Sequence, residues 1–236
     1  MTDVDQLRRL AIAGAALAIL VGMVSTGLVL AAFDWDFNAL TFGDPQTILT
    51  GGPQAAILWR WGMLGDMFYS YLLLLPLALF IHRRLRDRRP WLADLGLSGA
   101  LSYIFLGGAS AAIIAIAGSS LIETYAVAAP DERSFVAGDF RLLRDIFYFG
   151  VWQTLDAITA GLWALSTGWL LLRDRPVLGR LLVALGVAFW AGGVMTMLGV
   201  HSLAVLAAIF GTALAAWVVW VALTRPRAGS TWNAHA

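Results

Sequence analysis

The 236-residue sequence contains no cysteine, which excludes disulfide bonds, thiolate metal ligands and thiol nucleophiles. It also contains no lysine, because all 16 of its basic residues are arginine. Without lysine no side-chain Schiff base can form, so the chain is not a retinal-carrying rhodopsin. Charged residues of both signs are scarce, at 13% of the chain against roughly a quarter in soluble proteins.

Apolar sequence dominates instead. Hydrophobic residues make up 60% of the chain, and its mean hydropathy is +0.77. A helix that spans a bilayer needs about 20 apolar residues, and runs of that length recur along the chain. We therefore predict one integral membrane domain over residues 1–236, an all-α bundle of six transmembrane helices. The predicted spans are residues 10–33, 55–82, 95–121, 141–172, 177–200 and 203–224, with a disordered tail at 225–236.

The arginines predict the orientation of these spans. Twelve of the 16 fall at one set of predicted helix ends, at positions 8, 9, 83, 84, 86, 88, 89, 173, 175, 180, 225 and 227. Because basic loops are retained in the cytoplasm, we expect both termini to be cytoplasmic and the two long polar loops, 34–52 and 123–144, to be external. Part of the second loop can be helical. The expected location is the bacterial inner membrane.

Small residues and one proline predict how the helices pack. Gly14, Ala18 and Gly22 recur at every fourth position of the first predicted span, and Gly107 and Ala111 do so in the third. Small residues let helix backbones approach closely within lipid, so we expect these two helices to be central. In the second span, Pro76 predicts a kink.

Two acidic residues fall inside predicted spans, Asp66 in the second and Asp156 in the fourth. A charge in hydrocarbon costs at least a few kcal/mol and is seldom kept without a partner. Each aspartate lies 16 residues before the predicted inner end of its helix. At 1.5 Å per residue both sit about 24 Å up, in the outer half of a core about 30 Å thick. We predict that they anchor a ligand in an acidic cavity of the outer half.

Four other side chains are candidate ligand-binding residues near this depth. Tyr69 can donate a hydrogen bond beside Asp66, and Ser110 lies at a similar depth on the third helix. Arg60 is expected further out, where it can pair with Asp156 or Asp145. Trp152 belongs to a polar and aromatic stripe on the fourth helix that we expect to face the bundle interior, formed by Asp145, Phe149, Trp152, Asp156, Thr159 and Trp163.

No cofactor or metal is expected. His82, His201 and His235 are predicted at different depths, so they cannot jointly ligate a haem, and no zinc-ligand cluster has usable spacing. Nothing indicates a nucleic-acid partner. The arginine run at 83–89 is interpreted as a signal that stops membrane insertion, and contact with anionic lipid head groups is its alternative role. Membrane lipids are the expected surroundings.

A series of short motifs extends over most of the chain. They are Gly65-Asp66, Leu75-Pro76-Leu77, Arg83-Arg84-Leu85, Ser102-Tyr103-Ile104, Gly107-Gly108, Trp163 through Gly168, Arg173-Asp174-Arg175 and Leu178-Gly179-Arg180. Together they resemble a family of uncharacterised six-span bacterial membrane proteins, grouped as a domain of unknown function. The resemblance implies the topology and supplies no catalytic residues.

These observations favour a membrane protein without enzymatic activity that binds a small molecule, lipid or ion through Asp66 and Asp156, as a transporter or a sensor. One alternative is an accessory or scaffold subunit with a membrane-protein partner. A second is an intramembrane enzyme that uses the paired aspartates as general acid and base. The inverted repeat of many secondary transporters is not evident, which lowers the weight of transport within the first hypothesis.

Overall fold

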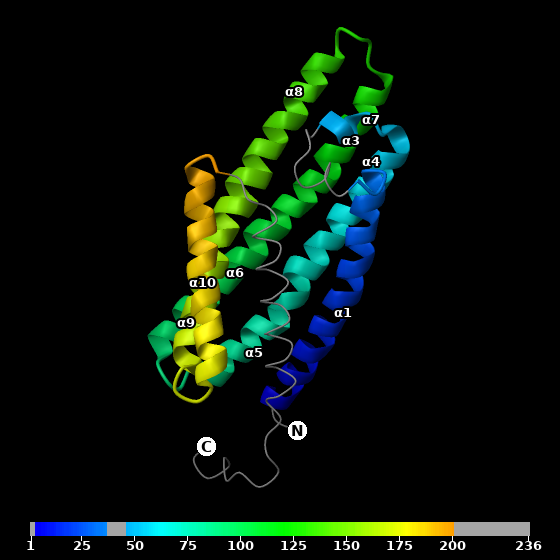
Figure 1. The fold of residues 1–236 in the computed structure, drawn as a ribbon. Helices are drawn as coiled ribbons and strands as arrows, with labels where there is room; N and C mark the ends of the chain where they lie inside the picture. Colours follow the sequence, from blue (N-terminus) through cyan, green and yellow to red (C-terminus); the bar gives the residue numbers. More distant parts are fainter. Residues whose placement is uncertain (1–2, 37–45, 201–236) are drawn as a thin grey trace.

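The computed structural model of the protein describes residues 3–36 and 46–200. These residues form helices joined by short turns (Figure 1), and no strand occurs among them. The prediction of an all-α fold is therefore confirmed for the described part of the chain. The predicted sixth span at 203–224 and the tail at 225–236 lie outside it.

Five long helices and one short helix make up the described ranges. The first long helix is α1 (Asp3–Ala32), and the short helix is α3 (Gln46–Leu49). The second long helix combines α4 (Gly52–Asp66), η1 (Met67–Tyr71), η2 (Leu72–Leu74) and α5 (Leu75–Leu85). The other three are α6 (Pro90–Ile113) with η3 (Ile114–Gly118) and α7 (Ser119–Val127); α8 (Arg133–Leu143) with η4 (Arg144–Asp156) and α9 (Ala157–Leu171); and α10 (Pro176–Met197).

Four helices of the described ranges are long and apolar enough to cross a membrane, namely Asp5–Ala32, Gly52–Leu85, Pro90–Val127 and Pro176–Met197. The helix at 133–171 is not among them, because polar side chains such as Gln153 and Asp156 lower its hydropathy. Large apolar side chains cover the outside of the bundle. Leu20, Met23 and Phe105 are each more than 60% exposed. A water-soluble monomer rarely exposes so much apolar surface, and a lipid environment accounts for it.

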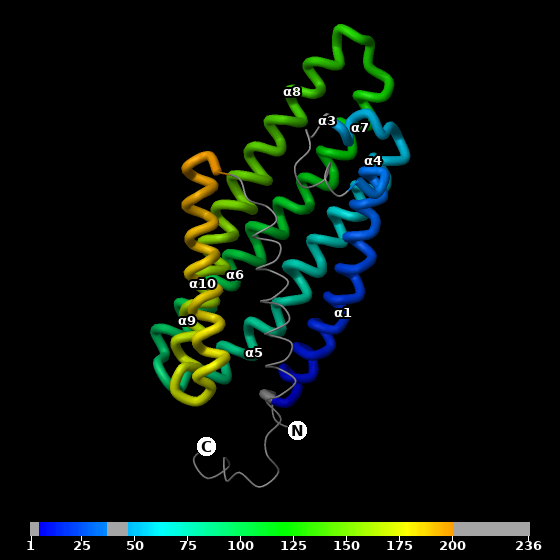
Figure 2. The backbone as a smooth tube through the Cα atoms, viewed as in Figure 1, coloured from blue at the N-terminus to red at the C-terminus, as the bar shows by residue number. Residues whose placement is uncertain are grey.

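The long helices pack in the order in which they occur along the chain. α1 packs against α4 and α5, the second helix against α6, α6 against α9, and α9 against α10. Figures 1 and 2 show this succession as a row with α1 at one edge and α10 at the other. The third helix therefore lies in the middle of the row. The first helix, which we also expected to be central, lies at the edge of the described bundle.

Glycines allow close contact between α1 and the second helix. A Cβ at Gly14 would lie 2.7 Å from the carbonyl oxygen of Leu73, and a Cβ at Gly22 would lie 2.9 Å from the ring of Tyr69. The hydroxyl of Ser25 also donates a 2.7 Å hydrogen bond across this contact, to the carbonyl of Gly62. The small residues of α1 thus lie where two backbones approach closely, even though α1 is at the edge of the described bundle.

The second helix departs from α-helical geometry in its middle. The π-helical turn η1 leads into the 3₁₀ turn η2, and α-helix resumes in α5, which has Pro76 in its first turn. Pro76 has no N–H to donate to the carbonyl of Leu72. The N–H of Leu75 donates to that carbonyl instead. The distortion expected from Pro76 therefore takes the form of a 3₁₀ turn directly before it.

Residues 123–144, expected to form a polar loop, are mostly helical. α7 continues to Val127 and α8 begins at Arg133, so only residues 128–132 form the turn between them. Pro90–Val127 has 38 residues, or about 57 Å at 1.5 Å per residue, against about 30 Å of hydrocarbon. The third and fourth helices therefore extend past the others as a helical hairpin, α7–α8 (Figure 1).

Candidate functional site

Asp156 is the last residue of η4 and is only 1% exposed. Its Oδ2 accepts a 2.7 Å hydrogen bond from the hydroxyl of Tyr71. Its Oδ1 has no hydrogen-bond partner among the described residues. Within the same ranges, the ion pairs of the arginines and of His82 all involve other carboxylates. Asp156 is thus a deeply buried carboxyl with one hydrogen bond, although a carboxylate can accept several.

Two local features bring Tyr71 to Asp156. Tyr71 lies at the junction of η1 and η2 with φ −128° and ψ −75°, outside the α-helical range, so its side chain leaves the helix in a direction that regular α-helix would not give. The third helix passes close by at Gly107, where a Cβ would overlap Tyr71 Cε1 and Asp156 Oδ2. A side chain at position 107 would therefore occupy the space of this hydrogen bond.

A chain of polar contacts continues from Tyr71 to Asp66. The ring of Tyr103 lies 4.9 Å from that of Tyr71, centroid to centroid, and its hydroxyl donates a 3.1 Å hydrogen bond to the carbonyl of Ser70. The hydroxyl of Ser70 donates a 2.8 Å hydrogen bond to Asp66 Oδ1. The two aspartates are close enough to interact electrostatically. The second, third and fourth helices therefore meet in one network with an aspartate at each end.

Two of the other predicted site residues adjoin this network. Trp152 donates a 3.2 Å hydrogen bond from Nε1 to the carbonyl of Gly107, and the side chain of Tyr69 lies close to Asp66. Ser110, one turn beyond Gly107 on α6, is 2% exposed. Trp152 and Tyr69 therefore lie against this network from the fourth and second helices, and Ser110 is buried close by on the third.

Arg60 does not join the site. Its guanidinium Nε donates a 2.9 Å hydrogen bond to the hydroxyl of Ser119, and its Nη2 lies 3.4 Å from Glu123 Oε1. The expected pairing with Asp156 or Asp145 is therefore wrong, and Asp145 pairs with Arg144 at 2.8 Å. The reason is the length of α7, which carries Glu123 alongside Arg60 where the sequence predicted the start of a loop.

The predicted stripe on the fourth helix is also only partly correct. η4 is a π-helical segment of 13 residues, whose i→i+5 hydrogen bonds place more residues in each turn than an α-helix does. The α-helical spacing from Asp145 to Asp156 therefore fails, and Asp145 is exposed while Gln153 is buried at 3%. Both Nε2 and Oε1 of Gln153 lack a hydrogen-bond partner among the described residues.

Sequence reasoning missed four residues of the site, namely Tyr71, Tyr103, Gly107 as a contact of the aspartate, and Gln153. Tyr103 and Gly107 stand in motifs that were interpreted only as packing signals. Gln153 carries the one signal that could have identified it, since it is a polar side chain three residues before an aspartate that is predicted to lie within a span. Tyr71 depends on the break in the second helix, which apolar periodicity does not predict.

The ligands available at the site are oxygen atoms of Asp66, Asp156 and the tyrosines, and the buried amide of Gln153 lies three residues before Asp156 on the same helix. Within residues 3–36 and 46–200, no group of three histidine, aspartate or glutamate side chains is placed to hold a metal ion. The chemistry that these atoms support is proton exchange on a carboxyl, hydrogen bonding, and attraction of a small cation.

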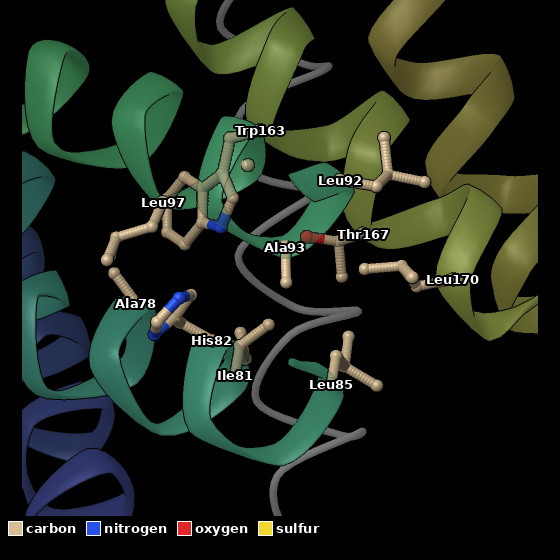
Figure 3. Close-up of a pocket in the computed structure, with 11 residues that line it drawn as sticks. Ala78, Ile81, His82, Leu85, Leu92, Ala93, Leu97, Trp163, Thr167 and Leu170 are labelled. Atoms are coloured by element: carbon tan, nitrogen blue, oxygen red, sulfur yellow. The ribbon is translucent and has the colours of Figure 1, made fainter. Parts of the chain in front are cut away.

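A shallow pocket lies between α5, α6 and α9, beside this network (Figure 3). His82, Leu85 and Trp163 contribute to its mostly apolar walls, and the ring of Trp163 lies 6.5 Å from that of Tyr103. Its cavity volume is about 10 Å³, roughly the room for one water molecule, far below the roughly 300–1,000 Å³ of small-molecule sites. It neither contains the aspartates nor has the size of the predicted ligand cavity.

Comparison with known proteins adds no relative. No family model matches the chain, and no curated protein and no solved structure is significantly similar to it. The resemblance to six-span bacterial membrane proteins therefore stays a prediction, and the arguments about function rest on the geometry of the described residues.

Proposed function

We propose that this chain is a six-span protein of the bacterial inner membrane, with both termini in the cytoplasm, that binds a proton or a small cation at Asp156 as part of a transporter or a sensor. The observation that carries this proposal is the buried Asp156 carboxyl, with its unpartnered Oδ1 and without an ion pair among the described residues. A charge in such surroundings is costly unless it is paired. Binding a proton or a cation removes that cost.

Gln153 supports the same proposal. Its amide lies three residues before Asp156 on η4 and makes no hydrogen bond of good geometry within the described part of the chain, although the hydroxyl of Tyr148 lies close to it. The rings of Tyr148 and Trp152, 5.6 Å apart between centroids, belong to the same segment of η4, and aromatic faces attract cations. The buried carboxyl of Asp156 itself suits a cationic ligand better than an anionic one, and these side chains of the same segment are compatible with such a ligand.

The π-helical segments further support a functional role. Each of the three helices that form the network contains one, and they are η1, η3 and η4. Asp66 directly precedes η1, and Asp156 ends η4. Such segments are rare in proteins and are frequent at functional sites, so their coincidence with both aspartates favours binding over simple packing.

The proposed orientation rests on the positions of the helix ends. The start of α1, the end of α5 and the turn between α9 and α10 lie at one end of the bundle (Figure 1). All three regions are rich in arginine, and basic helix ends are retained in the cytoplasm. The α7–α8 hairpin then projects from the outer face.

An Asp156→Asn variant tests the proposal. Asparagine keeps an acceptor for Tyr71, so the free energy of unfolding should change by no more than about 1 kcal/mol, while the carboxyl is lost. In lipid vesicles, infrared difference spectra between acidic and basic pH should show a buried carboxyl band in the wild type, and the Asp156 contribution to this band should be absent from this variant. The thermal unfolding midpoint should respond to replacement of choline by sodium ions only if the site takes a cation.

Asp145→Asn is the matched control, because Asp145 is an exposed carboxylate of the same π-helical segment. It should keep both the carboxyl band and any response to sodium ions. The proposal is wrong if Asp156→Asn retains the wild-type band and responds to sodium ions as the wild type does.

A second candidate function, as a subunit of a larger membrane complex, is favoured by the α7–α8 hairpin. Val127 and Phe135 are 84% and 75% exposed near its turn, where helix length places them beyond the hydrocarbon core. We expect the protein extracted in mild detergent to migrate with a stoichiometric partner if this function holds, and a Phe135→Ser variant to lose that partner. Migration of the wild type alone would contradict it.

A further inference from the structure

Four arginines from different parts of the chain converge at the arginine-rich end of the bundle. Arg8 lies near the start of α1, Arg84 near the end of α5, Arg88 in the following turn, and Arg175 directly before α10. The helix ends that carry them lie together at one end of the bundle (Figure 1). The Arg88–Asp174 ion pair joins the second helix to the turn before α10, and α1 packs against α5. Arg8, Arg88 and Arg175 therefore lie close enough to Arg84 to repel its guanidinium. Only Arg84 and Arg88 belong to the run at 83–89. The folded structure places them beside Arg8 and Arg175, which are distant in sequence.

The acidic side chains placed against this cluster do not balance its charge. Asp174 forms an ion pair with Arg88, which also donates a 3.0 Å hydrogen bond to the carbonyl of Leu170. With Asp5, one turn before Arg8 on α1, and Asp87, directly before Arg88, counted as two more carboxylates, the four arginines still outnumber the three acids. Residues 201–236 contain no aspartate or glutamate. The cluster therefore retains a net positive charge.

Arg8 supplies a second observation. Its Nε is buried and has no hydrogen-bond partner among the described residues. A buried donor without an acceptor costs roughly 1–3 kcal/mol, so an acceptor from outside the described chain would stabilise the folded state. An anion placed among the four guanidinium groups would provide that acceptor and reduce their mutual repulsion.

The position of the cluster indicates where the anion comes from. Arg8 and Arg84 lie at the ends of the apolar spans Asp5–Ala32 and Gly52–Leu85, which is the level of lipid head groups. The adjoining helix surface is apolar and open, with Leu10 and Val177 58% and 70% exposed. Acyl chains therefore cover the sides of the bundle directly beside the arginines.

We propose that Arg8, Arg84, Arg88 and Arg175 form a binding site for the phosphate of an anionic phospholipid. Guanidinium groups match phosphate geometry because two parallel N–H groups bond two oxygens. Each basic side chain at a membrane surface adds roughly 1 kcal/mol of attraction to anionic lipid. The site is separate from Asp156, so this proposal does not depend on the function proposed for Asp156.

The test compares two triple variants that remove equal charge. The site variant is Arg8→Gln with Arg84→Gln and Arg175→Gln; Arg88 is kept because it bonds Leu170 and Asp174. The control is Arg9→Gln with Arg83→Gln and Arg173→Gln, three exposed neighbours in sequence. Thermal unfolding of each protein in detergent is measured against added phosphatidylglycerol, phosphatidylcholine or inorganic phosphate.

We expect phosphatidylglycerol to raise the unfolding midpoint of the wild type and the control at similar concentrations. The site variant should need at least tenfold more of this lipid, as the loss of three basic contacts implies. Phosphatidylcholine should separate the variants little. Equal losses in the site variant and the control would overturn the proposal, and so would protection of the wild type by inorganic phosphate that matches phosphatidylglycerol.

A lysine version of the site variant guards against misfolding. Arg8→Lys with Arg84→Lys and Arg175→Lys keeps the three charges but not the paired N–H groups. It should fold in phosphatidylcholine like the wild type and respond to phosphatidylglycerol at a concentration between those of the wild type and the glutamine variant. If this variant responds to phosphatidylglycerol as the wild type does, the paired guanidinium–phosphate hydrogen bonds that we propose are not made.

Discussion

A Gly107→Ala variant is expected to lose about 3 kcal/mol of unfolding free energy, the upper part of the range for overpacked interiors. The new methyl group would overlap the ring of Tyr71 and Oδ2 of Asp156. Neither neighbour can yield easily, because the Tyr71 ring packs on Tyr103 and its hydroxyl is bonded to Asp156. The third helix must therefore move away from the second and fourth. Reversible unfolding in detergent measures the loss.

Gly108→Ala is the matched control for this prediction. The nearest atom to a Cβ at Gly108 is Tyr71 Cβ, at 3.5 Å, which is an ordinary van der Waals distance. Because alanine is also the better helix former, this variant should be as stable as the wild type or slightly more stable. Equal stability of both alanine variants would show that the third helix does not approach Tyr71 as closely as described.

A Gln153→Met variant is expected to gain about 2 kcal/mol of unfolding free energy in the ligand-free protein. Gln153 is 3% exposed, and neither polar atom of its amide makes a hydrogen bond of good geometry in the described ranges, although the hydroxyl of Tyr148 lies close to it. A buried polar group without a good hydrogen bond costs roughly 1–3 kcal/mol. Methionine has a similar length and no amide to satisfy. The same variant should weaken ligand binding at Asp156, so stability and function should change in opposite directions.

Gln54→Met gives the comparison for this gain, because Gln54 is an exposed glutamine on α4 whose replacement should change the unfolding free energy by less than about 0.5 kcal/mol. A Gln153→Met variant that is less stable than the wild type would mean that the amide has a partner in the folded protein. That result would remove Gln153 from the candidate site.

The fold class was accessible from the sequence because long apolar runs with few charges can form little other than helices in lipid. The packing order of the helices was not accessible from the sequence. The small residues of α1 mark a close contact, and they do so for any neighbour, so their pattern could not distinguish an edge helix from a central one. The length of α7 was also hidden, because Glu123 and the residues after it have the polarity of a loop although they continue a helix.

The candidate site was accessible in part for a similar reason. Asp66 and Asp156 stand out because ionisable residues are rare inside spans. The two aspartates are linked through Tyr71. The orientation of the Tyr71 side chain depends on a π-helical and a 3₁₀ turn, which the amino-acid composition does not predict. The assumption of uniform 3.6-residue turns through η4 likewise placed Asp145 inward and overlooked Gln153. Regular periodicity fails wherever backbone hydrogen bonds change partner.

The break in the second helix divides it into two rods that meet at Tyr71. A bend at this junction would swing α5, which carries Arg84, relative to α4, which carries Asp66. The Tyr71–Asp156 hydrogen bond is made at this junction. We therefore expect it to restrain the angle between α4 and α5, and we expect ligand binding at Asp156 to form or break it. Spin labels on α4 and α5 should report a broader range of distances in Tyr71→Phe than in the wild type, and an unchanged distribution would rule this restraint out.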